Sequence, residues 1–220
     1  MKEHFINELN RLLSTICAQG QQVETLIQRA ITAFTAHDLS LADAVVTADA
    51  AIDSEEVHIE EECLKILALY QPVATDLRTV VAMLKINVAL ERMADFGVHI
   101  AERVIKLHKL GEVPPPQPVD FDPMAEVVLG MLRDTMMVLS RSDLGLACKV
   151  IERDEVVDTM RRDNSLAARY TARSMPEYSG YYIECISISR ELERIADLNV
   201  DICRHIIYLR TGQITRHAAG

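Results

Sequence analysis

Apolar residues recur at intervals of three and four along most of the chain, which is the spacing expected when one face of an α-helix is buried. In the first half this pattern predicts three long helices, over residues 5–36, 40–70 and 72–110. We expect Pro72 in the first turn of the third helix and Gly111 at its end, because proline suits a helix start and glycine a helix end. No stretch shows the alternation typical of a strand.

The second half predicts three further helices, over residues 122–141, 144–173 and 176–210. We expect Asp122 to cap the first of these with Pro123 at its first position, and Ser174 to cap the last, which Gly212 would end. Between the halves stands "GEVPPPQPVD", whose prolines favour an extended spacer. The expected domains are therefore residues 1–110 and 121–212, with a proline-rich linker at 111–120 and a tail at 213–220.

The two halves repeat one another. "DLSLADAVVTADAAID" at residues 38–53 aligns without a gap with "DLGLACKVIERDEVVD" at residues 143–158, and "LERMADFGVHI" aligns with "LERIADLNVDI" further on. The two offsets, 105 and 102 residues, differ only by an ordinary change in loop length. The predicted fold is therefore all-α, with six helices forming two tandem three-helix bundles that are copies of one unit.

Composition and charge exclude several classes of protein. A formal net charge of −10 argues against binding of nucleic acid, which requires a basic face. No apolar run reaches the roughly 18 residues of a membrane-spanning helix, and the N-terminus lacks the apolar segment of a signal peptide. The five cysteines form no C-x-x-C pair, which fits reduced and buried thiols. We expect a cytoplasmic protein.

Pairs of acids four residues apart occur in two helices of each repeat, and this spacing puts both carboxylates on one helix face. When two helices form an antiparallel hairpin, residues equidistant from the turn lie at one level. The midpoint between the acid pairs is Pro72 in the first repeat and lies between Met175 and Pro176 in the second, where turns are expected. Four carboxylates should therefore meet in each repeat: Asp49, Asp53, Glu91 and Asp95, and then Asp154, Asp158, Glu193 and Asp197.

Such a set of carboxylates requires a countercharge. Arg92 and Arg194 within the motifs are too few, so the simplest compensation is a hard cation such as Mg²⁺, Ca²⁺ or Mn²⁺, with more than one ion sharing bridging carboxylates. His99 and Asp201 lie one turn beyond the motif acids and could extend their sites, and the nitrogen of His99 would favour a transition metal. The acidic run "EEVHIEEEC" has no matched partner in the second repeat, where "TMRRDNSL" stands, and we interpret it as solvated surface.

Catalytic motifs are scarce. A di-iron oxidase needs two Glu-x-x-His motifs in one bundle, whereas this chain has one, from Glu55 to His58, outside the matched acids. There is no P-loop, no G-x-S-x-G and no H-E-x-x-H. The prediction is a protein that is not an enzyme. A metal-dependent enzyme is the weaker alternative, because a metal can activate its own bound water.

Several motifs together resemble the PhoU family: "LALYQPVATDLRTVVAMLKINVALERMAD", the tandem "LERMADFGVHIAE" and "LERIADLNVDICR", and the paired "DLSLA" and "DLGLA". The resemblance covers essentially the whole chain. It implies two three-helix bundles whose E/D-x-x-x-D motifs, here the eight acids named above, hold metal clusters of iron or zinc in some members. The family often has glycine where Ala94 and Ala196 stand, and asparagine where His99 and Asp201 stand, which leaves the metal and the equivalence of the two sites open.

The resemblance also implies a function. The expected role is that of a cytoplasmic negative regulator of phosphate uptake and of phosphate-starvation signalling, which links the ATPase of a phosphate ABC transporter to a sensor histidine kinase. A homodimer is expected, with membrane association only through those partners. Metal-bridged acids would offer coordination positions to phosphate or to an acidic side chain. The alternatives are a metal-independent helical adaptor, and a paralogue that serves a low-affinity phosphate transporter or another ion transporter.

Overall fold

The computed structural model describes residues 2–116 and 119–211, and this part of the chain is helical without strands. The first half forms three long helices, α1 (Lys2–Ala36), α2 (Leu39–Tyr70) and α3 (Ala74–Lys109). The second half forms α4 (Asp122–Arg141), α5 (Leu144–Ser174) and α6 (Ser179–Thr211), with a 3-10 turn, η1 (Pro176–Tyr178), before α6. The predicted all-α fold is confirmed. The helix end expected at Gly212 and the tail lie outside the described residues.

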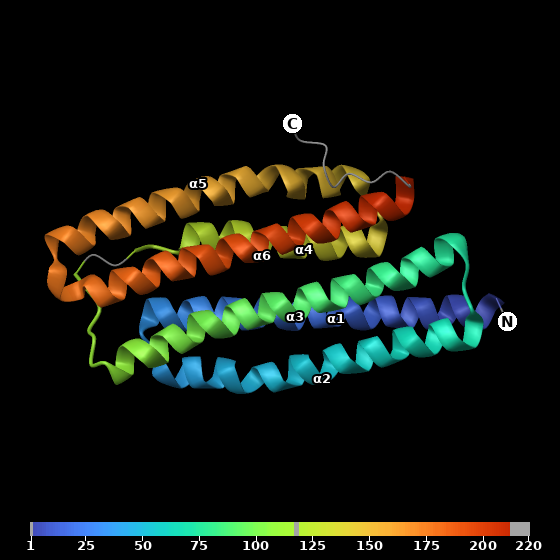
Figure 1. The fold of residues 1–220 in the computed structure, drawn as a ribbon, viewed down its shortest axis with the longest axis horizontal. Helices are drawn as coiled ribbons and strands as arrows, with labels where there is room; N and C mark the ends of the chain where they lie inside the picture. Colours follow the sequence, from blue (N-terminus) through green and yellow to red (C-terminus); the bar gives the residue numbers. More distant parts are fainter. Residues whose placement is uncertain (1, 117–118, 212–220) are drawn as a thin grey trace.

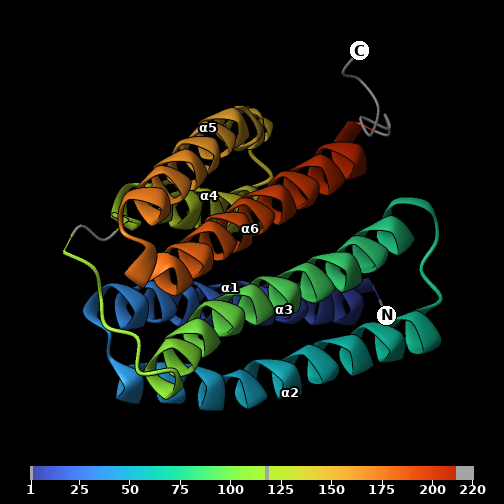
Figure 2. The ribbon, with the colours of Figure 1, turned by 60° about the vertical axis from the view of Figure 1, so that its left-hand side comes forward.

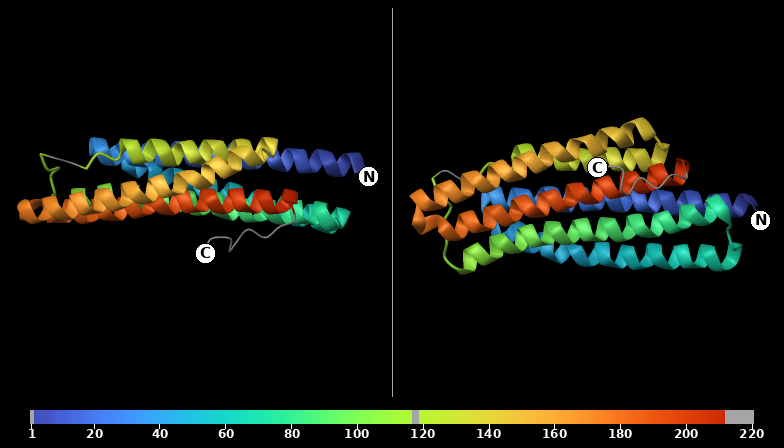
Figure 3. Two further views of the ribbon diagram at one scale, coloured as in Figure 1. Left: turned by 90° about the horizontal axis from the view of Figure 1, so that it is seen from above. Right: turned by 45° about the horizontal axis from the view of Figure 1, so that its top comes forward.

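The two three-helix bundles lie side by side along their lengths (Figure 1). They meet through two pairs of helices, α3 with α6 and α1 with α4. Within the described residues, α2 and α5 contact only elements of their own half, so they flank the molecule on opposite sides (Figure 2). In the view from above, α1 and α4 run together on one side, and α3 and α6 on the other (Figure 3).

Both bundles share one continuous apolar core. Phe34 on α1 stacks on Tyr181 of α6 with 5.3 Å between ring centroids, and its ring also meets Phe121 edge-on at 5.8 Å. At Gly20 the helices α1 and α4 approach closely, because a Cβ atom there would stand only 2.5 Å from the sulfur of Met136. Aromatic stacking and this close approach therefore hold the two halves together.

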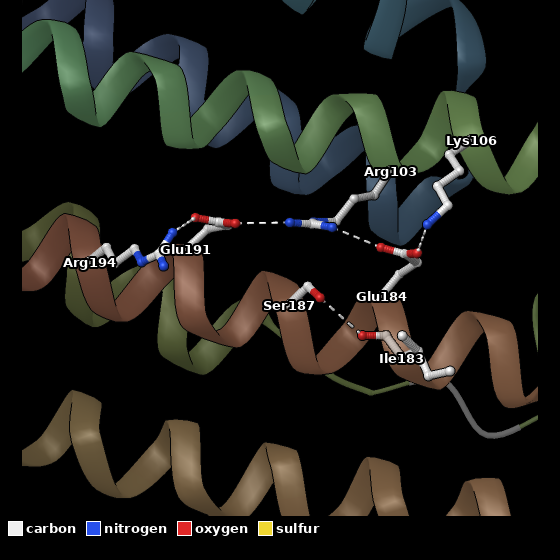
Figure 4. A network of polar contacts seen from close by, with 7 residues as sticks. All are labelled: Arg103, Lys106, Ile183, Glu184, Ser187, Glu191 and Arg194. Atoms are coloured by element: carbon white, nitrogen blue, oxygen red, sulfur yellow. Dashed lines mark hydrogen bonds and ion pairs between the residues drawn. The ribbon is translucent and has the colours of Figure 1, made fainter.

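Polar groups also cross the contact between α3 and α6 (Figure 4). Arg103 donates hydrogen bonds of 2.8 Å to Glu184 and to Glu191, and Lys106 donates a further bond to Glu184. Burial opposes the charge of Glu184, yet the hydrogen bonds from Lys106 and Arg103 outweigh it and lower the pKa of Glu184. Arg194 closes the network by pairing with Glu191 at 3.3 Å. The network fixes α3 against α6.

Two helix starts and one helix end carry capping residues that the sequence indicates. The first aspartate of each repeated segment caps its helix: Asp38 accepts a hydrogen bond from the backbone N–H of Leu41 at 2.9 Å, and Asp143 accepts one from Leu146 at 3.0 Å. Gly111 follows α3 with φ +69°, in the left-handed region that suits glycine, as predicted.

The predicted start of the third helix and two predicted helix caps were wrong. Pro72 lies in the loop, because α2 ends at a left-handed Gln71 and α3 begins only at Ala74. Asp122 is already inside α4, and its backbone N–H donates to the side chain of Asp120. The Ser174 hydroxyl donates back to carbonyls of α5, so it ends that helix and does not cap α6.

The cysteines were predicted to be buried, and this holds for Cys63, Cys185 and Cys203. Cys17 is only partly buried and Cys148 is exposed. The prediction was wrong for Cys148, which lies on the outer face of α5 although Ala147 and Val150 in the same turn are buried.

Candidate functional site

The four acids predicted to meet in the first repeat lie together between α2 and α3. Burial raises the pKa of the Asp49 carboxyl, and the carboxylates of Asp53 and Asp95 raise it further. Burial also raises the pKa of Glu91, followed by the effect of Asp95. The acids of α2 and those of α3 are therefore close enough for their like charges to act on one another across the two helices. We call these four residues the α2–α3 quartet.

Three other side chains belong to the surroundings of this quartet. Glu56 on α2 acts on Glu91, and Glu102 on α3 acts on Asp49; both raise the pKa of the acid that they face. His99 also lies near Asp49 and lowers its pKa, so the prediction that His99 adjoins the site is supported by its position. The interpretation of the whole acidic run as solvated surface was wrong for Glu56, which is partly buried and faces the quartet.

The quartet lies on the side of α3 away from α1. Gly97 faces α1 directly, since a Cβ atom there would stand 2.6 Å from a methyl group of Leu26. Asp95 precedes Gly97 by two residues and so lies about 200° around the helix. The acids therefore lie on the outer side of the α2–α3 hairpin, where Glu91 and Asp95 are half-buried and Asp53 is exposed.

Two polar atoms near this quartet lack a protein partner. The Oδ1 atom of Asp49 is buried and accepts no hydrogen bond. Asn87, one turn before Glu91, is fully buried; its amide donates to the backbone of Glu56 at 2.8 Å and lies 3.5 Å from the Glu56 carboxylate, while its own Oδ1 is unpaired. Buried acceptors without donors fit a cation as their missing partner.

The side chains as they stand do not form a finished coordination shell. Within the described residues, no group of three or more His, Cys, Asp and Glu side chains is arranged to hold a metal ion. The described residues also place no basic side chain in ion-pair contact with any acid of the α2–α3 quartet. The donor set is thus rich in oxygen and short of positive charge.

The four acids of the second repeat lie together between α5 and α6, and we call them the α5–α6 quartet. Burial, then Asp197 and Asp158, raise the pKa of Asp154 to about 6. Burial raises the pKa of Asp197, and Asp158 and then Asp201 raise it further. Asp201 therefore adjoins the second quartet, as the sequence predicted, although its side chain is exposed. The pKa of Glu193 is raised by burial against the opposing charge of Arg161.

Two arginines that the sequence analysis missed accompany the second quartet. Nε of Arg161 lies 2.8 Å from a carboxylate oxygen of Glu193, as an ion pair whose N–H is not aligned for a hydrogen bond. Arg204 lowers the pKa of both Asp154 and Asp197. The available signal was the segment "TMRRDNSL", whose first arginine is Arg161 and stands 105 residues after Glu56.

The arginines inside the two motifs point elsewhere. Arg194 pairs with Glu191 and places its guanidinium over the ring of Phe96 at 5.5 Å from the centroid. Arg92 is exposed and lines a groove with Glu56, Asn87 and His205, with a cavity volume of about 380 Å³. The quartets therefore do not depend on the motif arginines for their charge balance.

In the described part of the chain, no helix is both long and apolar enough to cross a membrane.

Comparison with known proteins agrees with this architecture. The PhoU domain matches twice, over residues 16–104 and 121–206. The "Phosphate-specific transport system accessory protein PhoU homolog" of Pseudomonas putida is 34% identical over 220 residues, covering 99% of this chain and 84% of the relative. The protein of the same name from Aquifex aeolicus is 34% identical over 211 residues, covering 96% and 94%.

Solved structures give the same result. The crystal structure of PhoU from Pseudomonas aeruginosa has a TM-score of 0.88 at 31% identity, covering 95% of this chain and 100% of the other. The regulatory protein PhoU from Streptococcus pneumoniae, described as belonging to the phosphate transport system, has a TM-score of 0.84 at 27% identity, covering 96% and 99%. With the two domain matches and the repeated acidic motifs, these findings place the chain in the PhoU family.

Proposed function

We propose that this protein regulates phosphate uptake as an accessory of a phosphate-specific transport system. The observation that carries the proposal is the pair of domain matches over residues 16–104 and 121–206, together with relatives named for that system. In finer detail, the protein acts in the cytoplasm as a negative regulator that links the ATPase of the transporter to a sensor histidine kinase. Its role is that of a regulator and not of an enzyme, and it works as a homodimer.

The acids would serve this role by holding metal. Asp49, Asp53, Glu91 and Asp95 would be the ligands in the first repeat, with His99 beside them, and Asp154, Asp158, Glu193 and Asp197 are the corresponding residues in the second. When bound, iron, zinc or a harder divalent cation would supply positive charge and open coordination positions for phosphate or an acidic side chain. Without metal, each quartet is anionic and repels phosphate or an acidic side chain of a partner, because like charges in a half-buried site are weakly screened.

Deletion of the gene in the native host tests the regulatory role. Cells without the protein should take up more phosphate in phosphate-rich medium and should express phosphate-starvation genes that are normally silent there. The wild-type gene should restore repression, and the double variant Asp49→Asn with Asp95→Asn should not. Asp43→Asn, an exposed acid on the same helix, is the matched control and should restore repression fully. Unchanged uptake and unchanged starvation-gene expression in the deletion strain would refute the proposal.

A metal-independent adaptor is the second candidate. The observation that favours it is the contact of Arg161 with Glu193, because it shows that this fold can balance part of a quartet with its own side chains. Elemental analysis of protein purified without chelator separates the two. Absence of bound metal, with partner binding unchanged by Asp95→Ala and Asp197→Ala, would support the adaptor.

A further inference from the structure

The two quartets differ in the charges that surround them. Aligned by the repeat, Arg161 corresponds to Glu56 at an offset of 105 residues, and Arg204 corresponds to Glu102 at an offset of 102 residues. Both positions adjoin their quartets in the structure. At each of them an acid of the first repeat is replaced by an arginine of the second, so the formal charge differs by two at each position.

The α5–α6 quartet is partly neutralised by these arginines. Arg161 contacts Glu193 at 2.8 Å, and both side chains are only about a quarter exposed, at 28% and 26%. Arg204 acts on Asp154 and Asp197 and lies 3.6 Å from Asp201. A guanidinium that pairs with a carboxylate occupies oxygens that would otherwise bind a cation, and its charge repels that cation.

The α2–α3 quartet has the opposite surroundings. Glu56 and Glu102 add negative charge, and the described residues bring no basic side chain into ion-pair contact with its acids. The fully buried Asn87 lies against Glu56 with an unpaired Oδ1, and the buried Oδ1 of Asp49 is unpaired as well. The unpaired Oδ1 of Asn87 is an observation independent of the acid count, and both unpaired acceptors are oxygens that a bound cation would satisfy.

We propose that the two sites are functionally distinct: divalent cations bind at the α2–α3 quartet, whereas the α5–α6 quartet is closed by Arg161 and Arg204 and takes up no metal. The proposal rests on the metal-binding part of the proposed function and makes it specific. One half of this protein then binds metal, and in the other half Arg161 and Arg204 supply positive charge in place of a metal.

Titration of the chelator-treated, full-length protein with Mn²⁺ alone, followed by calorimetry and elemental analysis, tests the proposal. Glu91→Gln with Asp95→Asn should lower Mn²⁺ affinity at least tenfold or abolish binding. Glu193→Gln with Asp197→Asn should leave both the affinity and the number of bound ions unchanged. Arg161→Glu with Arg204→Glu should increase the number of bound ions. Circular dichroism of each variant confirms that it is folded.

A charge-matched control removes the general effect of added negative charge. Arg169→Glu with Arg190→Glu changes two exposed arginines on the same two helices and should leave the number of bound ions at the wild-type value. Loss of metal in the Glu193→Gln, Asp197→Asn protein, or equal losses from both quartets, would overturn the proposal while leaving metal binding intact. Absence of any Mn²⁺ binding would overturn both the proposal and the metal-binding role, while the deletion experiment would still decide phosphate regulation.

Discussion

Arg103 on α3 donates a 2.8 Å hydrogen bond to Glu184 on α6, 81 residues further along the chain, and so joins the two repeats (Figure 4). The Glu184 side chain is 5% exposed, and the same arginine also serves Glu191, which is 7% exposed. Removing the arginine would leave two buried carboxylates with fewer partners, which is far more costly than losing a surface ion pair.

We therefore predict that Arg103→Ala lowers the free energy of unfolding by about 2 kcal/mol, since Glu184 and Glu191 each lose a charged partner while Lys106 and Arg194 remain. Urea unfolding followed by circular dichroism measures this change. Arg11→Ala is the control, because Arg11 is 78% exposed and its pair with Glu8 should contribute less than about 1 kcal/mol. Equal losses from the two variants would show that the Arg103 network does not hold the halves together.

Stability of the metal-free protein should fall as pH rises from about 4 to about 6. Burial and neighbouring acids raise the pKa of Asp154 to about 6, whereas an aspartate in the unfolded chain titrates near 3.9. Between these values the folded state holds a proton that the unfolded state has released, so the free energy of unfolding decreases with pH and is then constant above that range.

Asp154→Asn removes this titration and should stabilise the metal-free protein at neutral pH by about 1 kcal/mol, after allowance for solvent screening at a half-buried site. The pH dependence should be reduced and not abolished, because burial also raises the pKa of Asp197. Urea unfolding across this pH range measures the slope. The exposed Asp163→Asn is the control. A slope as steep in Asp154→Asn as in the wild type would contradict the assignment.

The close approach of α3 to α1 at Gly97 leads to a packing prediction. A Cβ atom at Gly97 would stand 2.6 Å from Leu26 and 3.3 Å from Ile27, so Gly97→Val should cost about 2 kcal/mol through overpacking. At Gly130 the nearest atoms are 3.7 Å away, and Gly130→Val should change stability by less than about 1 kcal/mol. Thermal melts of the pair compare the two sites, and similar shifts in both would argue against a tight contact at Gly97.

Mn²⁺ should also raise the thermal unfolding midpoint, because a ligand that binds only the folded state stabilises it by about 2.7 kcal/mol at one hundred times its dissociation constant. This increase should disappear in Glu91→Gln with Asp95→Asn and should persist in Glu193→Gln with Asp197→Asn. EDTA should reverse it. A midpoint that stays fixed in the wild type across all Mn²⁺ concentrations would contradict metal binding to the folded protein.

Much of the fold followed from the sequence because helix periodicity and hairpin symmetry are local properties. The acid pairs met where equal distances from the turns placed them, even though the predicted start of α3 at Pro72 was wrong. The level of a residue in a hairpin depends on the centre of the loop, which stayed near Pro72 when Tyr70 became the last helical residue and Ala74 the first. An error of two residues at a helix end therefore does not affect the site.

The surroundings of the quartets were less predictable, because they depend on rotation about the helix axes and on contacts between distant segments. Glu56 and Arg161 occupy equivalent places, yet the sequence alone did not show that either side chain turns toward its quartet. Arg103 and Glu184 meet only because α3 packs on α6, and no periodic pattern in the chain indicates which helices of two similar bundles will touch.

The most direct test of the two unlike sites is a crystal soaked in Mn²⁺, with X-ray data collected where manganese scatters anomalously. We predict anomalous density between α2 and α3, beside Asp49 and Asp95, and none between α5 and α6. Density beside Glu193 and Asp197, or at neither quartet, would contradict this prediction.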